Sequence, residues 1–330
     1  MKTVTIIGFN GALASAITGI IDLFRLAGVT WARIHGQQPT ALFKTRLLTE
    51  DGAPCRCING LTLVADGAWQ EVGALGDDDL LVIPTIGAPI AEILASNQAL
   101  VQWLAQFRAL PEREVRVASN CTGAFLLAAA GLLDGREATT HWGFGDQFRR
   151  QFPAVNLHPE KLVTVDGPIA CAGGGTAWWD LGVYLVERFA GPQTARELAK
   201  AFVIDAGRTS QAPYSALQSR RYHNDPAVFT VQNWLDSHYG DAITIDTLCQ
   251  ISCLSERTLL RRFKQATGET PHTYLQLLRI EVARTLLETG RDSLEQITQA
   301  VGYSDVSSFT RLFRRHTGLS PSQYRARFSR

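Results

Sequence analysis

The first side chains that could do chemistry are a cysteine and a histidine about twenty positions apart. Cys121 follows an apolar run at residues 115–119 that is typical of a buried strand, and residues 120–123 indicate a sharp passage into a helix. A thiol at such a turn lies at the carboxyl edge of an α/β sheet, where ligands bind, and the N-terminus of the following helix would stabilise its thiolate. His141 could bring an imidazole nearby. The plainer alternative, a small buried cysteine and a satisfied core histidine, is favoured by the spacing alone.

Arginines within a pattern that is written twice are the second such feature. Residues 248–274 and 297–324 each predict a short helix, a turn and a second helix that ends in Thr-Gly, with Pro and Tyr following at matching positions. Self-similarity at a fixed spacing indicates a repeated supersecondary unit.

Each copy carries its own start and stop signals. Ser255 and Ser304 are the expected N-caps of the second helices, because a hydroxyl can satisfy their free N–H groups. Gly268 and Gly318 are the expected C-terminal ends. In the second copy, Gly302 lies where the turn between the helices requires a positive φ.

The second helix of each copy separates apolar from basic side chains. Leu259 and Phe263 are four positions apart and share the inner face, so Arg257 and Arg261 share the outer one. A short capped helix with an apolar back and arginines in front suits the DNA major groove. The alternative is a solvated basic face on an ordinary helical bundle, but two such helices in tandem favour DNA binding.

The same face assignment predicts the individual DNA contacts. The residues expected to face the groove are Arg257, Thr258, Leu260 and Arg261 from the first copy, and Val306, Ser307 and Arg311 from the second. Arginine can fork onto guanine, whereas Leu260 and Val306 can meet thymine methyl groups. Arg314 and Arg315 lie at the far end of the second helix and are expected to touch phosphates.

Length and composition are those of a two-domain globular protein with a large core, at 330 residues and 45% hydrophobic content. The formal net charge is only +1, but residues 227–330 carry +3 and the remainder −2. The first residues read as a strand rather than a signal peptide, and no long apolar run follows, so we expect a cytoplasmic protein with no membrane segment. The six cysteines contain no paired CxxC elements, which predicts reduced thiols, no metal site and no cofactor.

The elements expected before residue 205 alternate between strands and helices, which predicts a mainly parallel sheet sandwiched by helices. The expected strands are 4–9, 43–49, 61–64, 80–84 and 114–119, with a hairpin at 162–165 and 169–172. The expected helices are 17–27, 89–107, 121–130, 144–151, 176–189 and 194–202. We therefore predict an α/β domain at residues 1–205, a linker at 206–227 and an all-α domain with two helix-turn-helix units at 228–330.

The C-terminal third resembles the AraC/XylS-type DNA-binding domain. The resemblance rests chiefly on residues 301–305 of the second copy and on the residues after them that match the family signature. These are Phe309, Arg311, Phe313, Gly318, Ser320, Pro321, Tyr324 and Arg325. The first copy departs from the pattern at Cys253, which replaces the usual turn glycine, and at Cys249, which replaces an alanine.

The first two thirds resemble the flavodoxin-like PfpI/ThiJ-type domain of the GlxA-type AraC regulators. The matching stretches are residues 119–125, 129–136, 138–142, 172–180 and 207–214. Active enzymes of the wider superfamily place an acidic residue before the first helix, and Ala16 stands at that position here. The resemblance therefore implies a domain that has lost turnover and keeps Cys121 and His141 as remnants.

The resemblance implies a transcription regulator that binds an operator in double-stranded DNA and senses a small-molecule effector. The residues expected to bind the effector are Asn120, Cys121, Thr122, His141, Trp142, Gly174 and Trp178. GlxA-type regulators include amine and amino-acid sensors, and tryptophan faces suit a cationic amine, although these tryptophans could equally pack the core. We also expect a homodimer. The alternative function is a PfpI-class enzyme, a Cys-His hydrolase or glyoxalase-like protein, that carries a DNA-binding module.

Overall fold

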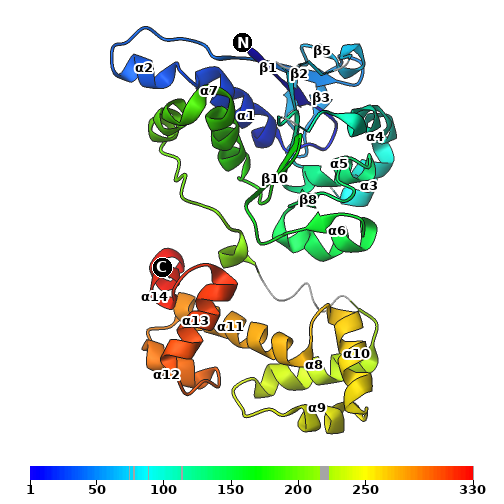
Figure 1. Cartoon of the computed structure of the whole chain (residues 1–330), viewed down its shortest axis with the longest axis vertical. Helices are drawn as coiled ribbons and strands as arrows, with labels where there is room; N and C mark the ends of the chain where they lie inside the picture. The colour runs from blue at the N-terminus through cyan, green and yellow to red at the C-terminus, as the bar shows by residue number, and fades with distance from the viewer. Residues whose placement is uncertain (74, 77–78, 88, 113, 216–222, 330) are drawn as a thin grey trace. The chain divides into compact units, whose positions relative to one another are not determined.

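The chain forms two compact units, Met1–Gln211 and Ala212–Arg330. A computed structural model describes the whole chain except residues 74, 77–78, 88, 113, 216–222 and 330 (Figure 1). The predicted linker at 206–227 thus lies partly outside the described residues. Within it, residues 208–211 bind to the first unit and residues 212–215 to the second.

A seven-stranded sheet in the order β10-β11-β7-β6-β1-β2-β5 forms the centre of the first unit. All neighbours are parallel except β10 and β11, which form the predicted hairpin. The strands are β1 (Lys2–Ile7), β2 (Phe43–Thr49), β5 (Gly67–Ala68), β6 (Asp79–Ile83), β7 (Val117–Asn120), β10 (Val163–Asp166) and β11 (Ile169–Ala172). The nearly continuous apolar runs of β6 and β11 suit strands that are covered on both faces.

Helices cover both faces of this sheet, as predicted (Figure 1). One face carries α1 (Ala14–Leu26) and α7 (Trp178–Phe202), and the other carries α3 (Ile90–Ser96), α4 (Gln98–Leu104) and α5 (Ala124–Ala129). Two short pairs of strands lie outside the sheet: β3 (Cys55–Arg56) with β4 (Thr62–Leu63), and β8 (Glu137–Ala138) with β9 (Asn156–Leu157). The remaining helices are α2 (Thr30–Ile34) and α6 (Gly145–Gln151).

Four of the predicted helices are divided, shortened or joined in the structure. The helix expected at 89–107 is broken at Asn97, which has a φ of −117° and whose side-chain amide donates to the Ile93 carbonyl. The helix expected at 121–130 begins only at Ala124, because Cys121–Gly123 is a 3₁₀ turn. The helices expected at 176–189 and 194–202 are the two arms of α7, which bends at Gly191 (φ 88°) just before Pro192.

The second unit is helical throughout its described part. It comprises α8 (Pro226–His238), α9 (Ile245–Ser252), α10 (Glu256–Thr267), α11 (Pro271–Thr289), α12 (Leu294–Ala300), α13 (Val306–Thr317) and α14 (Pro321–Phe328). The pairs α9–α10 and α12–α13 are the two predicted helix-turn-helix units, and the 19-residue α11 connects them (Figure 1).

Each helix-turn-helix unit has its own apolar core. The first is built around Leu259, Phe263 and Tyr274, and the second around Phe309, Phe313 and Tyr324. These are the residues that occupy matching positions in the two sequence copies. The sequence repeat therefore corresponds to two cores that are packed in the same way. Tyr239 packs against both cores and so connects the two helix-turn-helix units.

Among the described residues, no helix is long and apolar enough to cross a membrane.

Candidate functional sites

Cys121 occupies a strained turn between β7 and α5. Its φ is 54°, a left-handed conformation that non-glycine residues rarely adopt, and only 3% of its surface is exposed. Two residues later, Gly123 passes so close to the end of β6 that a Cβ would lie 2.4 Å from the Pro84 carbonyl oxygen. The close contact of Gly123 with the end of β6 therefore helps to hold Cys121 in its strained conformation. Strained residues that are held in place by their surroundings cluster at functional sites.

Hydroxyl and amide groups fix the residues on either side of Cys121. The Thr122 hydroxyl donates to the Ile86 carbonyl and accepts from the Ile86 N–H, at 2.9 and 3.1 Å. The Asn120 side-chain N–H donates to the Thr85 hydroxyl at 2.6 Å. The Thr140 hydroxyl donates to the Cys121 carbonyl at 2.9 Å, which brings the segment that carries His141 to the elbow.

The expectation that the helix N-terminus stabilises a thiolate at Cys121 is wrong. Burial raises the pKa of the Cys121 thiol above its usual range, although hydrogen bonds from Thr122 and Thr85 work in the opposite direction. Moreover, the turn leads into a helix of only six residues. Desolvation of the charged form outweighs these contributions, so the thiol stays protonated at neutral pH.

His141 caps the short 3₁₀ turn Trp142–Phe144. Its Nδ1 accepts from the Gly143 N–H at 3.1 Å, which assigns the remaining ring proton to Nε2. Burial lowers the pKa of the imidazole below its ordinary value. A neutral histidine that already accepts a hydrogen bond is a positioned neighbour of the elbow rather than a base that activates the thiol.

Gln211 is a buried side chain of this site that the sequence analysis placed in the linker. Its amide oxygen accepts from the Trp142 N–H at 3.2 Å. Its amide nitrogen lies within 2.9–3.3 Å of the Thr140, Pro159 and Lys161 carbonyls and of a threonine hydroxyl. The resemblance to the PfpI/ThiJ-type domain at residues 207–214 includes Gln211 and could have identified it. A plain linker would not be expected to match a domain motif.

The other predicted ligand residues divide into two groups. Gly174 (φ 76°) follows β11, and next to it a Cβ on Gly173 would lie 1.8 Å from the Gln211 amide nitrogen, so this turn belongs to the elbow region with Asn120, Thr122, His141 and Trp142. Trp178, in contrast, fills the core. Its ring lies where a Cβ on Gly19 would be, at 2.0 Å, and it packs against the tilted Trp179 ring, with ring centroids 4.0 Å apart.

Two buried side-chain oxygens at the end of β7 have no partner among the described residues, the Ser119 hydroxyl and the Asn120 amide oxygen, and the second borders Cys121 directly. Asn120 is only 1% exposed. A buried acceptor without a partner is costly, so it favours a bound donor.

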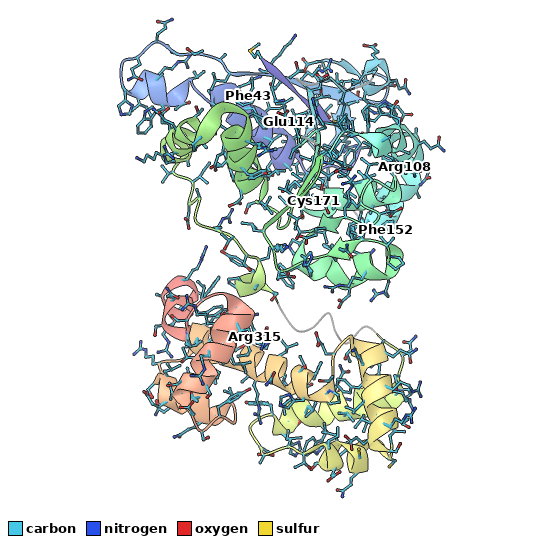
Figure 2. All side chains as sticks on the ribbon, viewed as in Figure 1. Phe43, Arg108, Glu114, Phe152, Cys171 and Arg315 are labelled. Carbon is cyan, nitrogen blue, oxygen red and sulfur yellow. The ribbon has the colours of Figure 1, made fainter. Side chains whose placement is uncertain are left out.

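The recognition helices α10 and α13 turn the predicted faces outward. Arg257, Leu260 and Arg261 of α10 are exposed and Thr258 is half-buried. Ser307 and Arg311 of α13 are exposed, Val306 is half-buried, and the Arg311 guanidinium donates to the Ser308 hydroxyl at 2.9 Å. Arg315 lies near the end of α13 and is exposed, like Arg314 (Figure 2).

The two recognition helices begin differently. Ser255 is the N-cap of α10, as predicted, but its hydroxyl donates to the Thr258 hydroxyl and satisfies no backbone N–H. The prediction of Ser304 is wrong, because Asp305 caps α13 and its carboxylate accepts from the N–H groups of Ser307 and Ser308. A carboxylate can accept two N–H bonds at once, which a hydroxyl does less well. Gly268 and Gly318 end the helices as predicted, with φ of 79° and 75°.

Arg262 is part of the basic side of α10 in the sequence, but it has a structural partner. Its guanidinium donates twice to the Asp225 carboxylate, at 2.6 and 2.8 Å. These bonds lower the pKa of the Asp225 carboxyl, which is the N-cap of α8. Arg262 therefore secures α8 to α10 and is not available to read a base.

This combination of an α/β domain with a cysteine elbow and a pair of arginine-bearing helix-turn-helix units defines a class, the DNA-binding transcription regulators that carry an enzyme-like domain. Comparison with known proteins agrees. Residues 3–188 match the DJ-1/PfpI family, and residues 248–327 match a helix-turn-helix domain.

Curated relatives extend this match along the chain. The chain is 33% identical over 295 residues to the HTH-type transcriptional regulator CdhR of Pseudomonas aeruginosa, which covers 89% of this chain and 85% of that protein. It is 29% identical to GlxA of Rhizobium meliloti (67% and 68% covered) and to ArgR of Pseudomonas aeruginosa (78% and 76%). The chain belongs to the DJ-1/PfpI family and, within it, to the GlxA-type AraC regulators. It is a transcription regulator rather than an enzyme.

Proposed function

We propose that this regulator binds a specific operator in double-stranded DNA through α10 and α13 and that a small nitrogen-containing metabolite bound at the Cys121 elbow controls it. The observation that carries the DNA-binding part is the pair of helices with apolar backs and exposed Arg257, Arg261 and Arg311. Because its partner would be DNA, we also propose a cytoplasmic location.

Four features support a ligand at the elbow. The Cys121 backbone is strained, the Asn120 oxygen is buried without a partner among the described residues, the thiol is protonated, and His141 is neutral. A protonated thiol and a neutral imidazole leave the site uncharged, and an acceptor such as the Asn120 oxygen would select an N–H donor. Trp142 and Phe144 lie beside His141, with ring centroids 5.3 and 5.8 Å from it, and could offer an aromatic face.

A thermal-shift screen of amines and amino acids tests the effector, because a ligand that binds only the folded state raises its stability by about 2.7 kcal/mol at a hundredfold excess over Kd. For the amine that gives the largest shift, Cys121→Ala is expected to reduce the shift while leaving DNA binding intact. Cys171→Ala is the matched control, since Cys171 is also buried, on the neighbouring strand β11 (Figure 2). Equal losses in both variants would place the ligand elsewhere.

The alternative, an active PfpI-class enzyme, makes an opposite prediction about the thiol. A catalytic Cys121 would alkylate quickly below neutral pH, whereas a thiol whose pKa is raised by burial stays protonated there and reacts slowly. Mass spectrometry of iodoacetamide-treated protein at pH 6 separates the two. Exposed Cys253 serves as the internal reference.

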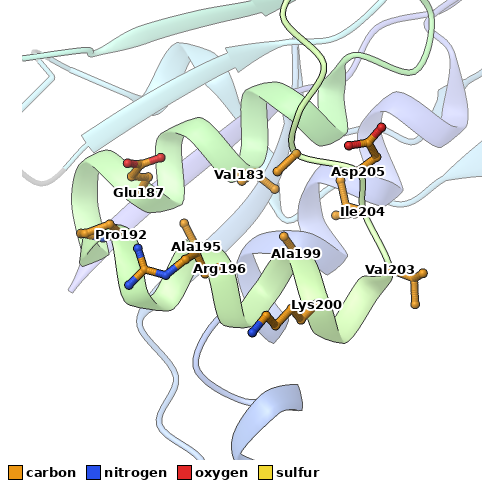
Figure 3. A pocket seen from close by; sticks show the side chains of 11 residues that line it. Val183, Glu187, Pro192, Ala195, Arg196, Ala199, Lys200, Val203, Ile204 and Asp205 are labelled. Carbon is orange, nitrogen blue, oxygen red and sulfur yellow. The ribbon is translucent and has the colours of Figure 1, made fainter. Parts of the chain in front are cut away.

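We further propose a homodimer that forms at a groove on α7. The groove has a volume of about 600 Å³ and lies between the two arms of the helix and residues 203–206 (Figure 3). Its lining is mainly apolar, with Glu187 and Asp205 as acids and Arg196 and Lys200 as bases. A second copy related by a twofold axis could pair acids with bases, because such an interface is self-complementary.

Val203 at the end of the groove supports this proposal. It is 91% exposed and has a φ of 56°, so a large apolar side chain is kept in an unfavourable conformation facing solvent. We expect Val203→Glu to shift the protein toward monomer in sedimentation velocity experiments. Val64→Glu is the control, because Val64 is 78% exposed on another part of the same unit. A wild-type protein that is monomeric at all concentrations would refute the dimer.

A further inference from the structure

The last residue of the first unit is buried in the candidate ligand site. The Gln211 side chain belongs to a residue that is 2% exposed, and its amide forms the hydrogen bonds to Thr140 and Trp142 described above. Its backbone N–H donates to the Glu160 carbonyl at 2.8 Å. Thr140 also holds the Cys121 carbonyl, so Gln211 is two hydrogen bonds from the elbow.

The first residues of the second unit are held just as firmly. Arg284 of α11, which is 6% exposed, donates to the Ala212 carbonyl at 2.7 Å and also to the Ser215 carbonyl. Between these two carbonyls, Pro213 is buried and the Tyr214 ring meets the Phe328 ring of α14 edge-on, with centroids 5.3 Å apart. Burying an arginine is costly. Two backbone carbonyls and the Glu281 carboxylate pair the terminal nitrogens of Arg284, while its Nε has no partner among the described residues.

The residues held at the two anchors are adjacent in the chain. Gln211 and Ala212 are consecutive, and a trans peptide fixes their Cα atoms about 3.8 Å apart. A ligand that displaces Thr140 or Trp142 disturbs the hydrogen bonds of Gln211, and Gln211 is joined directly to the residue whose carbonyl Arg284 binds. Because α11 connects the two helix-turn-helix units, a change at Arg284 reaches the helix that sets the spacing of α10 and α13.

We infer that residues 211–215 are the coupling segment through which occupancy of the elbow site alters the DNA-binding unit, with Gln211 and Arg284 as its two anchors. The regulatory role of this segment rests on the proposed effector site. The coupling between its two anchors can be measured without any ligand. Energetic coupling between two sites is reciprocal, so a change at either anchor has to be felt at the other.

Hydrogen exchange of the full-length protein without ligand tests the coupling. Gln211→Ala removes the acceptor of the Trp142 N–H, so exchange there rises by about fivefold, and α11 near Arg284 and α14 exchange faster as well. Reciprocally, Arg284→Met speeds exchange at residues 139–143 of the first unit.

Arg279→Met is the matched control. Arg279 lies on the same helix and also donates to two carbonyls, those of Tyr239 and Asp241 at 2.7 and 2.8 Å, but it binds no residue of the segment 211–215. This variant should speed exchange at residues 239–241 and leave 139–143 unchanged. Effects of Gln211→Ala and Arg284→Met that stay within their own units would overturn the inference.

Two further outcomes are separable. If Gln211→Ala does not fold, the Arg284→Met arm decides alone, because its distant readout lies in the other unit. If the coupling is observed but no amine stabilises the protein, the proposed effector class is wrong and the coupling role of residues 211–215 still stands. If an amine binds but the exchange effects stay local, the effector proposal survives without this segment.

Discussion

The two helix-turn-helix units have the same packing in their cores but different residues at the turn and at the helix start. Both bury the same pattern of side chains, with Phe263 in the first and Phe313 in the second fully inaccessible to solvent. They differ at the turn and at the start of the recognition helix. The first uses Cys253 in a left-handed conformation and a cap that reaches no N–H group, whereas the second uses Gly302 and the doubly accepting Asp305.

This difference shows that the core specifies the motif and the turn only has to be compatible with it. The first turn accepts a non-glycine residue because Cys253 is exposed, so its Cβ has space and costs only backbone strain. The second turn has no such space, since a Cβ on Gly302 would lie 2.7 Å from the Gly240 carbonyl oxygen and 2.8 Å from Arg279. The second turn is thus also part of the packing between the units.

Gly302→Ala is expected to cause the largest effect. The alanine would combine a strained φ of 80° with a collision against backbone, so the second unit should lose about 2–4 kcal/mol of stability. Chemical denaturation followed by hydrogen exchange of the amides of α13 measures it. A loss below about 1 kcal/mol, as expected of glycine in an open turn, would mean that the close approach to Gly240 is not rigid.

Asp305→Ala should have the next largest effect, and Ser255→Ala should have little. Removal of a cap that satisfies two N–H groups is expected to lower the melting temperature of the second unit by about 4–8 °C. Calorimetry of both variants makes the comparison. Equal shifts would contradict the assigned difference between the two caps.

The Asp305 cap should also respond to pH. Hydrogen bonds from Ser308 lower the pKa of the Asp305 carboxyl. A depressed folded-state pKa gives stability that is present above the unfolded value of about 3.9 and is lost as the pH falls through the folded pKa. The melting temperatures of wild type and Asp305→Ala should therefore converge at acid pH and stay apart at pH 7.

Cys253→Gly should have the smallest effect, and in the opposite direction. Glycine adopts the left-handed conformation without steric cost, so relief of the strain at φ 54° is expected to stabilise the first helix-turn-helix unit by about 1 kcal/mol. Denaturation midpoints measured beside those of Gly302→Ala decide the point. Destabilisation by this change would mean that loss of the thiol's hydrogen bond to the Gln250 carbonyl, at 3.7 Å, outweighs the relief of strain.

Much of this architecture could be predicted from the sequence, because its information is local. The repeated spacing of Leu259 and Phe263 and of Phe309 and Phe313 specifies two buried helix faces, and the apolar strands specify a covered parallel sheet. The error at Ser304 is also local. Serine and aspartate are both good caps, and the sequence does not say which of two adjacent residues begins the helix.

What could not be predicted depends on contacts between distant parts of the chain. Arg262 is like its neighbour Arg261 in the sequence, but only Arg262 finds Asp225, 37 positions away. The pKa of the Cys121 thiol follows from burial that no local pattern reports. Gln211 likewise binds residues about 50 and 70 positions away, so in the sequence it looked like part of a linker.

The most direct test of the account is to compare Arg261 with Arg262 on DNA. A duplex selected by the wild-type protein from a random library, and a scrambled version of it, are titrated with full-length variants at several salt concentrations. Arg261→Ala and Arg311→Ala should each cost about 1–3 kcal/mol on the selected duplex and little on the scrambled one. Arg315→Ala should weaken both duplexes alike and reduce the salt dependence. Arg262→Ala should retain the preference for the selected duplex, because its guanidinium binds Asp225. If Arg262→Ala relaxes specificity and Arg261→Ala does not, α10 reads DNA with a different face and the assignment fails.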